Sequence, residues 1–131
     1  MSSPALNASD FSASLTASDI EASVRFYTEG LGFEVAEQME VEGKLRYAEL
    51  QGGAAHIVVS QDDFAKGRDR VKGVGVRFYL ETDQDITALA ERARAGGVTL
   101  DSEPAALPWG PLAFMFTDPD GFKFTVANRR E

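Results

Sequence analysis

The feature that most constrains the fold of this 131-residue sequence is an internal repeat of secondary-structure order. Residues 11–60 and 74–127 each predict a strand, a helix and then three strands that end in a hairpin. The polar stretch 61–73 is expected to link them, with short tails at 1–10 and 128–131. Since the repeat is too long for a solenoid, we expect one α+β domain of two βαβββ modules that form a cleft-bearing half-barrel.

Local signals divide each half into elements. Ser18 and Glu21 resemble a capping box at the start of the first helix, which Gly30 and Gly32 should end. The segment 103–110, with two prolines, predicts a loop. The expected strands are 11–17, 33–39, 44–50, 55–60, 74–81, 98–102, 112–117 and 122–127.

Charge and composition exclude several kinds of partner. The chain has 13 basic and 21 acidic residues, a net charge of -8, and no cysteine. An acidic chain is a poor partner for nucleic acid, and no apolar run approaches the ~20 residues that cross a bilayer. We therefore expect a cytoplasmic protein that binds neither nucleic acid nor membrane.

The first strand of each module has a face that is unsuited to a core. Ser12 and Ser14 alternate with apolar residues, so this face should line a cleft where ligands bind. In the second module, the same parity turns Arg77 and Tyr79 away from the helix. A shift of one residue in register would expose Val76 instead.

Two segments resemble signatures of a known family. The first is Asp19-Ile20-x-x-Ser23-x-x-Phe26-Tyr27-x-x-x-Leu31-Gly32-Phe33. The second is Pro108-Trp109-Gly110, followed by Phe114 and Asp118-Pro119-Asp120-Gly121. Both are similar to signatures of the vicinal oxygen chelate superfamily (glyoxalase I, fosfomycin-resistance enzymes, extradiol dioxygenases and bleomycin-resistance proteins), and most of all to its bleomycin-resistance branch. The resemblance covers roughly residues 11–127 and implies paired βαβββ modules, usually in a homodimer.

The resemblance also implies where metal ligands would lie, on the first and last strands of each module. Those positions fall on Ser12, near Val58, on Val76 or Arg77, and on Thr125. Hydroxyls are weak ligands, valine has no donor atom, and arginine has no free lone pair. With a single histidine in the chain, we expect no metal and no other cofactor.

Other residues are candidates for contact with a ligand. His56 is either a ligand contact or base in the cleft, or a histidine hydrogen-bonded near the hairpin. Tyr47 and Glu49 lie on one side of their strand, either in the cleft or on a solvated face. Trp109 is held between prolines and either stacks on a ligand or packs at a dimer seam or core. One of two faces, that of Phe114 or that of Met115, should also line the cleft.

We expect a metal-free binding protein that sequesters an aromatic or cationic compound, such as an antibiotic, at a dimer interface. The alternatives are a glyoxalase-like lyase or dioxygenase-like enzyme with unusual metal ligands or none, and an interaction module with a vestigial cleft. Ligand identity, turnover and exchange of modules between subunits stay open. The residues expected to contact the ligand are Ser12, Ser14, Tyr47, Glu49, His56, Val58, Arg77, Tyr79, Trp109, Phe114 and Thr125.

Overall fold

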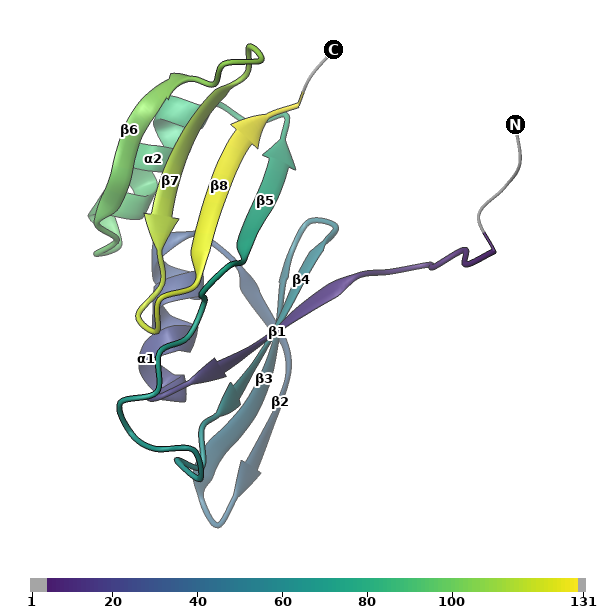
Figure 1. Ribbon diagram of the computed structural model, residues 1–131, viewed down its shortest axis with the longest axis vertical. Coiled ribbons are helices and arrows are strands. Elements are labelled where there is room, and N and C mark those ends of the chain that lie inside the picture. Colours follow the sequence, from purple (N-terminus) through teal and green to yellow (C-terminus); the bar gives the residue numbers. More distant parts are fainter. Residues whose placement is uncertain (1–4, 130–131) are drawn as a thin grey trace.

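The computed structural model describes residues 5–129 and contains two four-stranded sheets (Figure 1). The first module comprises β1 (Ser12–Ala17), α1 (Ile20–Arg25), the π-helical turn η1 (Phe26–Gly30), β2 (Glu34–Val41), β3 (Lys44–Gly52) and β4 (Ala55–Gln61). The second comprises β5 (Arg77–Thr82), α2 (Ile86–Ala95), β6 (Leu100–Ala106), β7 (Leu112–Thr117) and β8 (Lys123–Asn128). The expected tails at 1–10 and 128–131 lie partly outside the described residues.

The two sheets have the same topology, which confirms the repeat that the sequence predicts. Their strand orders are β1-β4-β3-β2 and β5-β8-β7-β6. In each sheet the first strand of the module runs parallel to the last, and the other pairs are antiparallel. The first strand is therefore an edge strand in both sheets, and the helix that follows it crosses one face.

The cap of the first helix differs from the prediction. Asp19, in an extended conformation, is the N-cap, and its side chain accepts a hydrogen bond from the backbone N–H of Ala22. Ser18 is occupied elsewhere, because its N–H donates to Asp120 and its hydroxyl accepts from Lys72. The capping box expected at Ser18 is therefore wrong, although the helix begins where the sequence predicts.

Two strands of the second module have other bounds than expected. β5 begins at Arg77 rather than at residue 74, because Gly73 and Gly75 have φ angles of 78° and 77°, which interrupt an extended strand. β6 continues through much of the segment expected as a loop and includes Pro104. Proline is tolerated there because β6 is an edge strand with an irregular register between Ser102 and Ala105.

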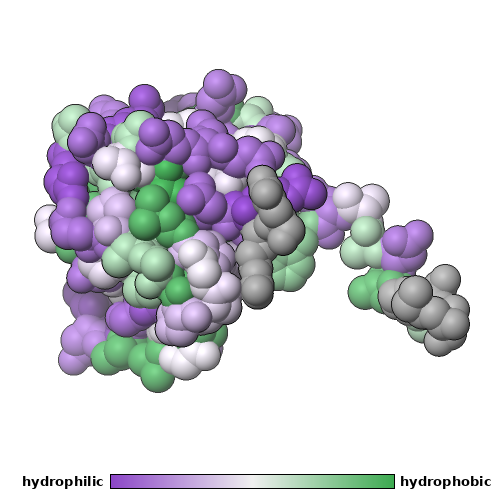
Figure 2. Space-filling view, turned by 90° about the horizontal axis from the view of Figure 1, so that it is seen from above, coloured by the Kyte–Doolittle hydropathy of each residue, from purple (hydrophilic) through white to green (hydrophobic). Residues whose placement is uncertain are grey.

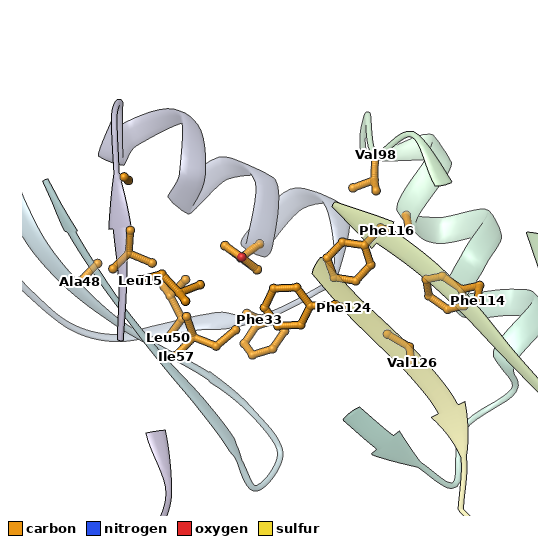
Figure 3. Close-up of a cluster of buried hydrophobic side chains, with 14 of the residues drawn as sticks. Leu15, Phe33, Ala48, Leu50, Ile57, Val98, Phe114, Phe116, Phe124 and Val126 are labelled. Carbon is orange, nitrogen blue, oxygen red and sulfur yellow. The ribbon is translucent and has the colours of Figure 1, made fainter. Parts of the chain in front are cut away.

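A single hydrophobic core joins the two modules (Figure 3). Its centre is a run of aromatic rings in which Tyr27 lies 5.9 Å from Phe33 of the first module and 5.8 Å from Phe124 of the second. Phe124 in turn stacks on Phe116 at 5.0 Å. Each sheet turns its helix-covered face to this core, so the opposite face of each sheet points outward from the chain.

A buried hydrogen bond also ties the modules together. The hydroxyl of Tyr27, from η1, donates to Asp118 Oδ2 at 2.8 Å, in the turn between β7 and β8. The other oxygen of Asp118 accepts the backbone N–H groups of Asp120 and Phe122. Burial raises the pKa of both Tyr27 and Asp118, and the negative charge of Asp118 raises that of Tyr27 further.

The linker is fixed by a buried ion pair. Lys72 Nζ lies 3.0 Å from Asp62 Oδ2 and 3.4 Å from Asp120 Oδ1, and all three side chains are almost fully buried. The backbone N–H of Phe64, followed by Lys72, lowers the pKa of Asp62. These contacts hold both ends of the segment 62–72 against the β7–β8 turn.

The described part of the chain contains no helix with the length and apolar character that crossing a membrane requires. Residues 5–11, which precede β1, are exposed and lead away from the body of the protein, as the view from above shows (Figure 2). In this segment Leu6 and Phe11 are 77% and 80% exposed.

Candidate functional site

The six candidates of the first module gather on one face of its sheet, the face opposite α1. The strand registers place Ser12 beside His56, and Ser14 beside Val58. On the far side of β4, Val58 is paired with Glu49, and Tyr47 lies two residues before it on β3. The intervening residues of β1, Leu15 and Ala17, are buried in the core. We call this surface, made by the outward residues of β1, β4, β3 and β2, the first wall.

A phenol and a carboxylate meet at the centre of the first wall. The hydroxyl of Tyr47 donates to Glu49 Oε1 at 2.6 Å. This hydrogen bond raises the pKa of Tyr47, and the negative charges of Glu49 and Glu37 add to the effect. Glu37 was not among the sequence candidates. It reaches this face through a register shift in β2 between Val35 and Glu37, which no residue pattern signals.

His56 is hydrogen-bonded rather than free. Its Nδ1 lies 2.7 Å from a carboxylate oxygen of Asp10, in the segment before β1. The backbone N–H of Phe11, followed by His56, lowers the pKa of Asp10. One of the two expectations placed the hydrogen-bond partner of His56 near the hairpin, but the partner lies in the segment before β1. Contact of His56 with a ligand stays a prediction.

The second module carries Arg77, Tyr79 and Thr125 on the outward side of its sheet, where Arg77 and Tyr79 are exposed and Thr125 is buried. Arg77 pairs with Lys123 and Tyr79 with Thr125, whereas the alternate residue Phe78 turns toward the core. The register left open by the sequence is therefore the one that exposes Arg77. Its Nη1 lies 3.4 Å from both the Phe124 carbonyl oxygen and the Thr125 hydroxyl. We call the outward face of β5, β8, β7 and β6 the second wall.

Phe114 requires a correction. It is 1% exposed and pairs with Val126 on the helix-covered face of the sheet, so it does not belong to the second wall. Its neighbour Met115 lies opposite Thr125 and therefore belongs to the second wall. Side chains alternate along a strand, so the sequence shows that Phe114 and Met115 lie on opposite faces of the sheet. It does not show which of the two faces points outward.

Trp109 lies in the turn between β6 and β7 and is 49% exposed. The turn is closed by backbone hydrogen bonds from Gly110 to Leu107 and from Leu107 to Pro111. The indole is therefore displayed on a structured loop at one end of the second sheet. Its contact with a ligand stays a prediction.

The two walls do not face each other within one chain. Both sheets share one core on their inner faces, so the first and second walls lie on outward surfaces. Within one chain, these two walls therefore do not enclose a cleft between them. A groove of about 810 Å³ does separate the modules, but its floor includes Leu31, Phe33 and Leu89. Of the sequence candidates, only Tyr79 and Phe114 line it.

The residues at the expected metal positions do not fit a metal ion. Ser12 lies next to His56, which is engaged with Asp10, and Val58 offers no donor atom. Arg77 and its neighbour Lys123 would repel a cation, and Thr125 is 2% exposed. Among residues 5–129, no group of three or more histidine, cysteine or acidic residues is placed to hold a metal ion. The walls instead offer rings, hydroxyls and separate charges.

Comparison with known proteins fits this architecture. A family profile described as "Glyoxalase/Bleomycin resistance protein/Dioxygenase superfamily" matches residues 11–126. The chain is 29% identical over 115 residues to a putative lactoylglutathione lyase of Brassica oleracea var. gemmifera. That match covers 85% of this chain and 41% of the plant protein, so the chain spans about two fifths of its curated relative.

Solved structures share the fold. TioX from Micromonospora sp. ML1 superposes with a TM-score of 0.76 at 18% identity, over 94% of this chain and 100% of TioX. TnmS3, an antibiotic binding protein from Streptomyces sp. CB03234, gives 0.71 at 24% identity, over 98% and 100%. These likenesses support the fold, and the profile match over most of the sequence decides the family. The chain belongs to the glyoxalase, bleomycin resistance protein and dioxygenase superfamily.

Proposed function

We propose that this protein binds an aromatic or cationic small molecule, such as an antibiotic, without a metal ion, and that the site is a cleft formed between two copies of the chain. The single observation that carries the proposal is the composition of the walls. At the positions where metal-dependent relatives would carry ligands, the outward sides of the sheets carry serine, valine, arginine and a buried threonine. A binding role needs recognition alone, which such groups can provide.

The first wall has the chemistry that a cationic, flat compound requires. Glu49 and Glu37 supply negative charge beside the ring of Tyr47. Aromatic faces attract cations and stack on flat rings, and Tyr79 and Trp109 are 43% and 49% exposed. TnmS3, which has the same fold, is an antibiotic binding protein. This likeness adds weight to a binding role among the functions of the superfamily.

A second copy supplies what one chain lacks. Because the walls point outward, a closed cleft needs a wall from another molecule. Apolar side chains are exposed on or beside both walls, among them Met39 at 52% and Val76 at 48%. These side chains would lose contact with water if the walls of two copies met, which favours association. We therefore propose a homodimer in which the first wall of one copy meets the second wall of the other.

Bleomycin is a suitable first probe, since the superfamily includes bleomycin resistance proteins. Trp109, the only tryptophan, should report binding by a change in fluorescence. We expect saturable binding, and at least tenfold weaker binding for Glu49→Gln. The control Glu91→Gln, which removes an exposed charge on α2, should bind normally. Saturable binding that is equally tight in both variants would contradict the assignment of the site.

The alternative is a glyoxalase-like enzyme, which the likeness to plant lactoylglutathione lyases favours. Metal analysis of protein purified without chelator separates the two functions. One tightly held metal equivalent per cleft would support the enzyme and overturn the proposal above. Protein that binds bleomycin while holding substoichiometric metal would support the binding function.

A further inference from the structure

Each wall contains a pair of like charges on neighbouring strands. On the first wall, Glu37 of β2 is the register partner of Glu49 of β3. On the second wall, Arg77 of β5 is the partner of Lys123 of β8. Like charges directly opposite on neighbouring strands repel each other. In the first pair, which lies on antiparallel strands, the Cβ atoms are about 4.5–5.5 Å apart. The second pair lies on parallel strands. The first pair is acidic and the second is basic.

Within the part of the chain that the structure describes, no ion pair neutralises these charges. The ion pairs of residues 5–129 involve other side chains: His56, Lys72, Arg94 and Arg129 with their acidic partners. Among the described residues, the Arg77 side chain donates hydrogen bonds to two uncharged oxygens, each at 3.4 Å. All four side chains lie on surfaces that the single chain leaves uncovered. Their unfavourable arrangement would be relieved by an opposite charge from outside the chain.

The other charges near the walls do not change this contrast. Glu40, opposite Leu45, adds a third carboxylate to the first wall. On the second wall, Glu81 lies four residues from Arg77, near the far end of β5. Asp101 lies at the opposite edge, where it accepts a hydrogen bond from Thr117. The first wall is therefore acidic, and the second is basic at the end where Arg77 and Lys123 lie.

We propose that Arg77 and Lys123 of one copy face Glu37 and Glu49 of a second copy across the cleft, without direct contact, so that opposite charge selects the pairing of unlike walls and leaves the carboxylates open to a ligand. This inference deepens the proposed function, since it rests on a cleft between two copies. In a two-fold dimer the arrangement would occur twice. Pairing of two first walls would gather four carboxylates, and pairing of two second walls would gather four cations. Either arrangement is disfavoured by repulsion.

Charge reversal tests the inference. The double variants Glu37→Lys/Glu49→Lys and Arg77→Glu/Lys123→Glu should each dimerise at least tenfold more weakly than the wild type. The quadruple variant, in which both walls are reversed, should dimerise again. An equimolar mixture of the two double variants should form heterodimers, since both of their clefts are then complementary. Native mass spectrometry gives the species, and circular dichroism confirms that each variant is folded. The control Glu91→Lys should dimerise as the wild type does.

Mixing the wild type with the quadruple variant separates unlike from like pairing. If unlike walls meet, the mixed dimer has two repulsive clefts, so the two proteins should self-sort. If like walls meet, the mixed dimer is the favoured species, and the inference is overturned. A monomeric wild type, or double variants that dimerise as tightly as the wild type, would also overturn it. If the Arg77→Glu/Lys123→Glu variant dimerises as tightly as the wild type but no longer binds bleomycin, Arg77 and Lys123 contact the ligand and do not select the pairing of the walls.

Bleomycin titration of the same proteins keeps the two proposals distinguishable. Self-sorting dimers that do not bind bleomycin would support the charge-selected pairing and count against the proposed function. If the wild type and the quadruple variant form mixed dimers freely and also bind bleomycin, the result would support the proposed function and refute the pairing.

The salt dependence of the dimer is a further test. Higher salt should weaken the wild-type dimer, because partly exposed charge pairs are screened. A dimer that is insensitive to salt would count against the pairing.

Discussion

Replacing Tyr27 with phenylalanine removes one buried hydroxyl and preserves the ring that joins the two modules. Tyr27 is 0% and Asp118 5% exposed, and their hydrogen bond is 2.8 Å long. In the variant, Asp118 Oδ2 loses this donor in a site that water does not reach freely. Leaving a buried acceptor unsatisfied costs about 1–3 kcal/mol. We therefore expect the free energy of unfolding to fall by about 2 kcal/mol.

The expected shift in melting temperature follows from chain length. Unfolding entropy is about 2.1 cal/mol/K per residue, so a loss of about 2 kcal/mol lowers the Tm of this chain by about 7 °C. Calorimetry and urea denaturation followed by circular dichroism measure both quantities. Tyr47→Phe is the matched control, because it removes a phenol hydrogen bond on the partly exposed first wall. We expect little change in its Tm.

The effect of Tyr27→Phe should also depend on pH. Burial raises the pKa of Asp118 above its ordinary value of 3.8, so the folded state binds a proton more readily than the unfolded state. Stability therefore falls as pH rises through the interval between 3.8 and the folded pKa. Loss of the Tyr27 hydroxyl removes a contact that favours the carboxylate, so the deficit should be larger at pH 7 than at pH 4. A Tm unchanged by the substitution, or a deficit equal at both pH values, would refute this reasoning.

Three further perturbations test other parts of the structure. Gly96→Ala should cost about 1–3 kcal/mol in urea denaturation, because an added Cβ would meet the carbonyl oxygen of Glu29 at 2.3 Å. An unaffected midpoint would show that the modules do not approach so closely. Asp62→Asn should flatten the loss of stability below pH 3.8, since the lowered pKa of Asp62 makes the wild type lose stability as this group is protonated; thermal melts with equal acid slopes would contradict this. Trp109→Ala should weaken bleomycin binding at least tenfold by calorimetry while the Tm changes little, because the indole is half exposed; unchanged affinity would remove Trp109 from the site.

The repeat, the fold class and most of the elements could be predicted from the sequence, because they depend on local periodicity. Alternation in β1 and its neighbours fixed which residues share a face, and the first wall follows from that parity. The N-cap could not be assigned, since Ser18 and Asp19 are both good caps. Contacts of Ser18 with Asp120 and Lys72, far along the chain, decided in favour of Asp19.

The relation between the walls could not be predicted for a different reason. Parity states which side of a sheet a residue lies on, but not how two sheets are placed relative to each other. Here a core of rings from both modules, centred on Tyr27, draws the inner faces together and turns the walls outward. Glu37 escaped notice because a register shift in β2 depends on pairing with β3. Phe114 was misplaced because its strand is apolar on both faces.

A complementation experiment measures most directly whether the site is built from two copies. One variant carries Tyr47→Ala and Glu49→Ala on the first wall, and another carries Arg77→Ala and Tyr79→Ala on the second. Each alone has no intact cleft, whereas a mixed dimer combines the intact walls of its two subunits in one cleft. Titration of the mixture with bleomycin should therefore recover binding at up to one site per mixed dimer. Native mass spectrometry that shows mixed dimers, together with no recovery of binding, would contradict the account.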